Sequence, residues 1–117
     1  MNGIALVKSK HFAIRIVRLY AYLRDEKHEY VMSKQLLRCG TSIGANLAEA
    51  EYAISKSDFQ SKAYIALKET AETIYWLELL HSTDYLTEMQ FSSLHQDADE
   101  IRRILASSTK TLKATLS

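Results

Sequence analysis

Hydrophobic residues recur at steps of three and four residues along most of this chain, which is the spacing of one face of an α-helix. Four stretches show this spacing, and short polar segments separate them. The pattern predicts helices over residues 9–24, 31–54, 58–82 and 87–113. Because the connections between these stretches are short, consecutive helices should run in opposite directions. We therefore expect an all-α protein, folded as an antiparallel up-down-up-down four-helix bundle.

Composition and capping signals agree with long helices. The chain has 117 residues, no proline and three glycines, so it predicts one domain over residues 1–117 with few breaks. Ser57 lies three residues before Gln60 and resembles a capping box at the start of the third helix. Thr87 is the expected cap of the fourth helix.

Two glycines lie inside the predicted second helix, where each costs about 1 kcal/mol relative to alanine. Gly40 and Gly44 are four residues apart and share a face of that helix. Close approach by a neighbouring helix or by an aromatic ring would offset the cost. Tyr75 and Trp76, in the third helix, are the candidates for the ring.

A row of hydrogen-bonding side chains follows one face of the second helix, and a buried row of this kind needs a complementary row. We expect the complement on the third helix. The resulting structural polar network would contain Arg38, Ser42, Asn46, Glu49, Glu69, Glu72, Tyr75 and Trp76. Its centre would be a buried ion pair of Arg38 with a glutamate, completed by hydrogen bonds from Ser42 and Asn46. A register-fixing network and a polar ligand pocket are the two interpretations, and the near balance of charges favours the first.

Charge is distributed unevenly, although the net charge is only +1. Residues 1–24 hold five basic residues and residues 101–117 hold four, and neither segment contains an acid. In the predicted bundle these segments meet at one end, which we call the basic pole. Its candidate nucleic-acid contacts are Lys8, Arg15, Arg18, Lys62, Lys110 and Lys113. Such a patch would bind RNA phosphates weakly or an acidic protein surface, and a solvated helix face is the alternative.

Little in the chain points to catalysis. Glu78 and His81 supply half of the ligand set of a di-iron bundle, which needs a second Glu-x-x-His pair that this chain lacks. A metal-dependent enzyme built on these two residues remains the alternative class. We expect no catalytic residue, no cofactor and no metal, hence a protein that is not an enzyme. The single cysteine, Cys39, should be a buried thiol and fits a cytoplasmic protein, and no stretch approaches a membrane span.

Two blocks of sequence carry a family resemblance. Residues 35–50 read Gln-Leu-Leu-Arg-Cys-Gly-Thr-Ser-Ile-Gly-Ala-Asn-Leu-Ala-Glu-Ala, and residues 59–80 contain Phe59, Lys62, Lys68-Glu69, Glu72 and Tyr75-Trp76. The chain resembles the bacterial four-helix-bundle proteins encoded in intervening sequences of 23S ribosomal RNA genes. This resemblance implies a compact bundle, assembly as a homopentameric ring and no established catalytic activity. A related branch, the accessory variability protein of diversity-generating retroelements, works with a reverse transcriptase and its RNA.

The sequence thus predicts an oligomeric interaction protein whose first partner is itself. Aromatic residues that a monomer would expose also favour a homo-oligomer, namely Tyr20, Tyr52, Tyr64 and Tyr75. The family resemblance sets the expected number of subunits at five. An RNA-associated accessory protein that uses the basic pole is the first alternative, and the metal-dependent enzyme is the second.

Overall fold

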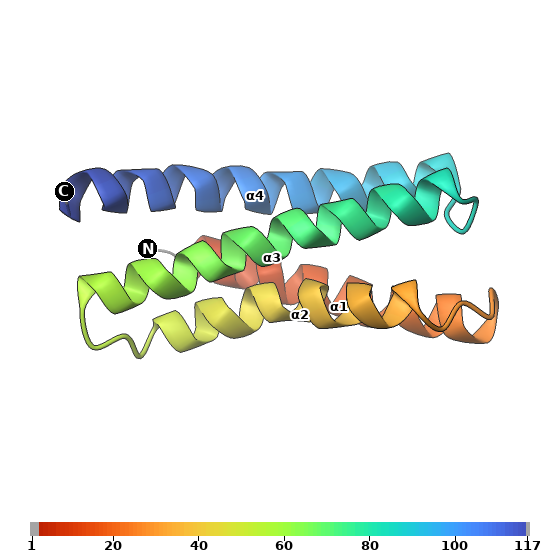
Figure 1. The fold of residues 1–117 in the computed structure, drawn as a ribbon, viewed down its shortest axis with the longest axis horizontal. Helices are drawn as coiled ribbons and strands as arrows, with labels where there is room; N and C mark the ends of the chain where they lie inside the picture. Colours follow the sequence, from red (N-terminus) through yellow and green to blue (C-terminus); the bar gives the residue numbers. More distant parts are fainter. Residues whose placement is uncertain (1–2, 117) are drawn as a thin grey trace.

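Four helices make up the described part of the chain, and no strand occurs in it. The computed structural model describes residues 3–116, and the side chains of residues 3–109. The helices are α1 (Gly3–Asp25), α2 (Met32–Ala50), α3 (Lys56–Ser82) and α4 (Glu88–Leu116). Figure 1 shows them side by side along the long axis, with the connections alternating between the two ends. The all-α class is confirmed, and the arrangement fits the predicted up-down-up-down order.

Two helix boundaries differ from the prediction by four residues or more. α1 begins at Gly3 rather than near residue 9, because Ala5 and Ser9 are buried and extend the core-facing side toward the amino terminus. α2 ends at Ala50 rather than at residue 54. Ile54, which the prediction placed in this helix, lies beyond its end and is 94% exposed.

Side chains cap the starts of α3 and α4. Ser55 Oγ accepts a hydrogen bond from the Asp58 N–H at 3.0 Å, and the Asp58 carboxylate accepts the Ile54 N–H at 3.2 Å. The prediction of a Ser57 capping box was therefore wrong, because the extended backbone that a cap requires lies at Ser55. The Thr87 cap is confirmed, since Thr87 and Gln90 each accept the other's backbone N–H.

A buried glutamate starts α2. The Glu29 carboxylate accepts the N–H groups of Val31, Met32 and Ser33 at 3.1, 3.1 and 2.7 Å. Ser33 Oγ donates to the Glu29 carbonyl oxygen in return, at 2.8 Å. Burial raises the pKa of Glu29, but the three N–H donors lower it further, so the pKa lies below its ordinary value. The carboxylate thus supplies acceptors and negative charge where the helix needs both.

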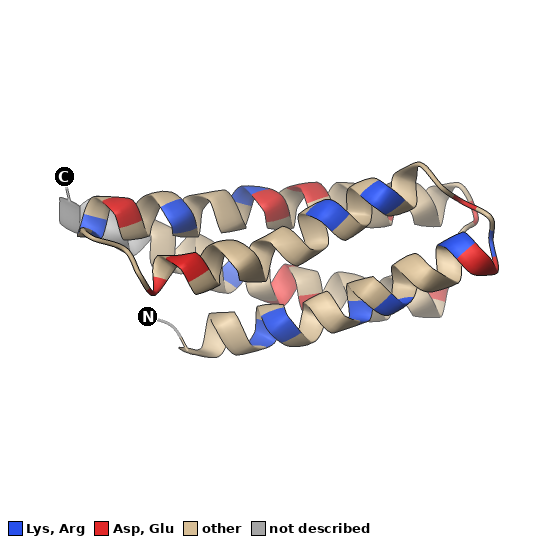
Figure 2. Ribbon diagram, turned by 90° about the horizontal axis from the view of Figure 1, so that it is seen from below, with Lys and Arg blue, Asp and Glu red and all other residues tan. Residues whose placement is uncertain are grey.

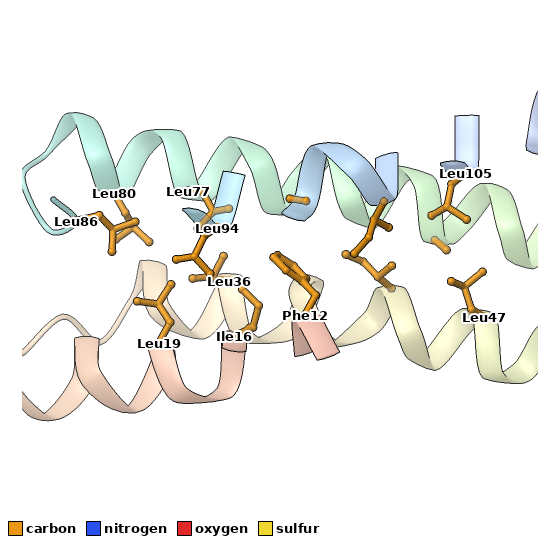
Figure 3. Close-up of a cluster of buried hydrophobic side chains, with 14 of the residues drawn as sticks. Phe12, Ile16, Leu19, Leu36, Leu47, Leu77, Leu80, Leu86, Leu94 and Leu105 are labelled. Carbon is orange, nitrogen blue, oxygen red and sulfur yellow. The ribbon is translucent and has the colours of Figure 1, made fainter. Parts of the chain in front are cut away.

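All four helices and the α3–α4 connection contribute to one apolar core. Figure 3 shows the side chains pointing toward one another across the bundle: Phe12, Ile16, Leu19, Leu36, Leu47, Leu77, Leu80, Leu86, Leu94 and Leu105. Cys39 is buried beside this core, as predicted, and burial raises the pKa of its thiol. A protonated thiol of this kind packs as a small apolar group.

The glycines of α2 face α1. A Cβ atom on Gly40 would lie 2.9 Å from two side-chain carbons of Ile16, and one on Gly44 would lie 3.2 Å from Ser9 Oγ. Close approach by a neighbouring helix is therefore the reason for these glycines. The alternative, a ring of Tyr75 or Trp76 against them, is wrong, because α3 packs on another side of α2.

Candidate functional site

The predicted polar row joins α2 to α3 through Arg38. Its guanidinium donates to a carboxylate oxygen of Glu72, and its Nη1 lies 3.4 Å from Glu69 Oε2. Trp76 Nε1 donates to the same Glu72 oxygen at 3.1 Å. The hydrogen bonds from Arg38 and Trp76 hold the pKa of Glu72 below its ordinary value, and the bond to Glu72 raises the pKa of Arg38. The pairing of Arg38 with a glutamate of the third helix is as predicted.

This ion pair lies at the surface, whereas the prediction placed it in the interior. The Arg38 side chain is 51% exposed, and those of Glu72 and Glu69 are 36% and 20% exposed. The buried stripe of α2 contains Cys39, Gly40 and Ile43, so Arg38 falls at the edge of the contact between the helices. An exposed pair of this kind fixes helix register weakly and costs little to break.

The remaining members of the row form separate pairs. Asn46 Nδ2 donates to the hydroxyl and the carbonyl oxygen of Ser42, at 3.0 and 2.9 Å. The prediction that these two residues complete the hydrogen bonding of Arg38 is therefore wrong. Glu49 accepts from Lys62 Nζ at 2.7 Å. Tyr75 is 55% exposed, and its ring meets that of Trp76 edge-on at 5.1 Å between centroids.

Two basic residues of α1 pair with acids of α4. Lys8 Nζ lies 3.3 Å from Glu100 Oε1, and Arg15 Nη1 lies 2.6 Å from Asp97 Oδ2. Arg15 also donates to the hydroxyl of Ser93 at 2.9 Å. Direct packing between α1 and α4 is sparser than between the other neighbouring helices, so these ion pairs span a thinly packed seam. The positive charges of Lys8 and Arg15 are thus compensated within the chain.

The basic pole is mixed in charge as far as the side chains are described. The start of α1, the α2–α3 connection and the end of α4 do share one end of the bundle (Figure 1). Lys62, however, is bound to Glu49, and Figure 2 shows basic and acidic residues interspersed along the helices. Arg18 is exposed and pairs with no described residue. Lys110 and Lys113 lie outside the described side chains.

Glu78 and His81 do not form a metal-binding site with other described side chains. His81 Nε2 lies 2.8 Å from the Glu88 carboxylate, and its ring stacks on Phe91 at 4.2 Å between centroids. Glu78 is exposed. Across residues 3–109, no three histidine, cysteine or acidic side chains gather as a metal-binding group. His81 instead ties the end of α3 to the start of α4.

One surface was missed at the sequence level, and we call it the outer face of α1. It consists of Ile4, Val7, Ile14 and Val17, whose side chains are 61%, 53%, 44% and 50% exposed. These residues lie away from the core-facing positions, such as Phe12 and Ile16, so α1 is apolar on two sides. Their steps of three and seven were the available signal. The pattern of the core-facing residues obscured it, because both sides share the helical period.

Other proteins resemble the chain in sequence and in fold. The family model described as 23S rRNA-intervening sequence protein matches residues 2–107. A crystal structure from Bacteroides thetaiotaomicron VPI-5482, described as a protein with unknown function from the S23 ribosomal protein family, has a TM-score of 0.89 and 55% sequence identity. That match covers 91% of this chain and 98% of the other. No curated protein matches.

Both findings agree with the resemblance carried by residues 35–50 and 59–80. The matched region spans α1, α2, α3 and most of α4, and the similar crystal structure covers the same bundle nearly from end to end. The relatives have no established function. None of the four helices, over the described residues, is long and apolar enough to cross a membrane. The chain belongs to the 23S rRNA-intervening sequence protein family.

Proposed function

We propose that this protein is a non-enzymatic, cytoplasmic interaction module that works as a homo-oligomer of five up-down-up-down bundles. The observation that carries the proposal is the outer face of α1. A helix of a four-helix bundle needs one apolar side to fill the core, and a second apolar side is stable only when something covers it. The similar proteins of the family support the bundle, and the family resemblance supplies the number of subunits.

The polar row supports a structural role rather than a ligand pocket. Its charged members, Arg38 with Glu72 and Glu49 with Lys62, already satisfy one another within the chain. Asn46 and Ser42 likewise bond to each other. These pairs leave no unbalanced charge for a ligand to neutralise. We infer that the two ion pairs tie α2 weakly to α3 at the edge of their contact and that the row is part of the protein surface rather than a ligand site.

The subunit count is the direct test of the proposal. Native mass spectrometry of the purified full chain should give one dominant species at about five times the 13.4 kDa mass of one chain. A dominant species of another multiple would support the oligomer and overturn the count of five. A dominant species at the mass of one chain would overturn the proposal.

A further inference from the structure

A cavity of about 490 Å³ opens at the end of the bundle where α1 begins and where α2 is connected to α3. The α2–α3 connection and the start of α3 extend beyond Gly3, the first described residue of α1 (Figure 1). Gly3 lines the cavity, and a Cβ atom on it would meet no atom of a neighbouring element within 4 Å. The cavity is therefore open space beside the start of α1, and sites for small molecules have volumes of about 300–1,000 Å³.

The walls of this cavity, which we call the end cavity, are largely apolar. Three helices contribute four apolar residues to the walls: Leu6, Leu47, Ala50 and Phe59. Leu47 and Ala50 are buried, whereas Leu6 and Phe59 are half-buried. Ile54 of the α2–α3 connection also lines the end cavity, although it is 94% exposed. An apolar group bound among these side chains would remove more apolar surface from water, which is favourable.

Two exposed residues of opposite charge also line the end cavity. They are Glu51, just after α2, and Lys56, the first residue of α3. Neither side chain pairs with a described residue. Other charged side chains nearby do have partners, since Glu49 binds Lys62 and Asp58 accepts a backbone N–H. The end cavity thus combines an apolar interior with one unpaired charge of each sign.

We propose that the end cavity binds a free amino acid with a large apolar side chain, for example phenylalanine. The apolar side chain occupies the interior, the carboxylate pairs with Lys56, and the ammonium group pairs with Glu51. A ligand of this kind neutralises both charges, whereas an apolar acid or an apolar amine leaves one of them unpaired. The helix ends have the same polarity, because the start of α3 favours a negative group and the end of α2 favours a positive one. The site lies within one chain and does not depend on the number of subunits.

A series of four small molecules tests which parts of the ligand are recognised. In isothermal titration calorimetry of the full chain, phenylalanine should bind most tightly. 3-Phenylpropanoate lacks the ammonium group, phenethylamine lacks the carboxylate, and glycine lacks the apolar side chain, so each should bind at least about fivefold more weakly. Equal affinities for phenylalanine and either charged analogue would overturn the recognition of both charges. Absence of phenylalanine binding at about 10 mM would overturn the site itself.

Substitution of the two charged residues tests their roles. Lys56→Gln should weaken the binding of phenylalanine and 3-phenylpropanoate about fivefold without weakening that of phenethylamine. Glu51→Gln should weaken the binding of phenylalanine and phenethylamine without weakening that of 3-phenylpropanoate. The matched controls are Lys34→Gln and Glu26→Gln, near the opposite end, where both side chains are exposed and pair with no described residue. Equal effects of these controls would overturn the assignment, because net charge alone would then explain the changes.

The position of the ligand can be tested independently of its affinity. In NMR spectra of the full chain, phenylalanine should shift the methyl resonances of Leu6 and Leu47 and leave those of Leu86, in the α3–α4 connection at the opposite end, unchanged. Gly3 and Leu6 share one face of α1, so Gly3→Phe should fill the end cavity without displacing its neighbours. This variant should lower the affinity for phenylalanine at least about tenfold while its helical circular dichroism persists. Shifts confined to Leu86, or unchanged binding by a folded Gly3→Phe variant, would overturn the proposed location. If that variant fails to fold, the methyl shifts decide.

Discussion

At the scale of single residues, Glu29 has the most consequential placement in the chain. Its carboxylate is buried, yet it holds three backbone N–H groups at the first turn of α2. Those donors would have no partner within the helix, and leaving them unpaired in a buried site is costly. Periodicity cannot reveal such a role, because Glu29 lies in a polar connection where glutamate is ordinary.

Glu29→Gln should lower the free energy of unfolding by about 1–3 kcal/mol at pH 7, because a neutral amide accepts fewer and weaker bonds. The pKa of Glu29 is lower in the folded state than its ordinary 4.5, so its stabilisation is present above that pH and is lost as the pH falls below it. Urea denaturation should therefore show a smaller difference in unfolding free energy between variant and wild type at acid pH than at pH 7. Glu26→Gln, in the same connection but exposed, should change little at either pH. Equal effects of the two substitutions would exclude the capping role.

Arg38 shows how exposure changes the expected energy of an ion pair. A buried pair loses about 3–5 kcal/mol when one partner is removed, whereas an exposed pair contributes about 1 kcal/mol or less. Because Arg38 is 51% exposed, we expect the smaller loss for Arg38→Ala, measured by urea denaturation at matched protein concentration. A double-mutant cycle with Glu72→Gln should give a coupling energy below about 1 kcal/mol. A coupling of several kcal/mol would mean that the pair is buried in the working protein, by a second subunit.

At the scale of elements, the contact between α1 and α2 depends on glycine. Gly40→Ala would gain helix propensity, but its Cβ would meet the branched carbons of Ile16 at 2.9 Å. β-Branched side chains have few alternative rotamers, so the helices must move apart. We expect a net loss of about 1–3 kcal/mol, measured by thermal or urea denaturation. Combining it with Ile16→Ala should cost less than the sum of the two single changes, and strict additivity would show that the two residues are not in contact.

The sequence predicted four helices because apolar periodicity is a local property of each helix. The cap of α3 was misplaced because Ser55 and Ser57 have similar side chains, and only the backbone conformation separates them. The pairing of Arg38 with a glutamate of the third helix could be predicted because the two side chains carry opposite charges. The exposure of the Arg38 side chain could not, because it depends on where the contact between α2 and α3 ends. The outer face of α1 was missed for a related reason. Apolar residues on two sides of a helix all fit the helical period, and burial alone tells which side faces the core.

At the scale of the whole molecule, ion pairs between α1 and α4 oppose the use of the basic pole for RNA. A phosphate contact by Lys8 or Arg15 would have to break the pair with Glu100 or Asp97. The RNA binding expected from the sequence can nevertheless be tested. The test consists of removing the competing carboxylates and asking whether RNA affinity appears.

Asp97→Asn with Glu100→Gln should release Lys8 and Arg15 and tighten binding to structured RNA in a gel-shift assay at low salt. Each cation that reaches a phosphate should steepen the dependence of the logarithm of affinity on the logarithm of salt by about 0.7–0.9. The control, Glu78→Gln with Asp84→Asn, removes the same charge from exposed residues that hold no described base. Equal RNA binding by the two variants would show that the tighter binding depends only on net charge. Lys8 and Arg15 would then not form an RNA surface.

We propose that one bundle is incomplete, because α1 has a second apolar side that another copy would cover. Light scattering of the wild-type protein during dilution through the micromolar range measures this most directly. We expect a constant mass of about five times 13.4 kDa until the lowest concentrations. A constant mass of 13.4 kDa at every concentration would contradict it, because the outer face of α1 would then be stable in water.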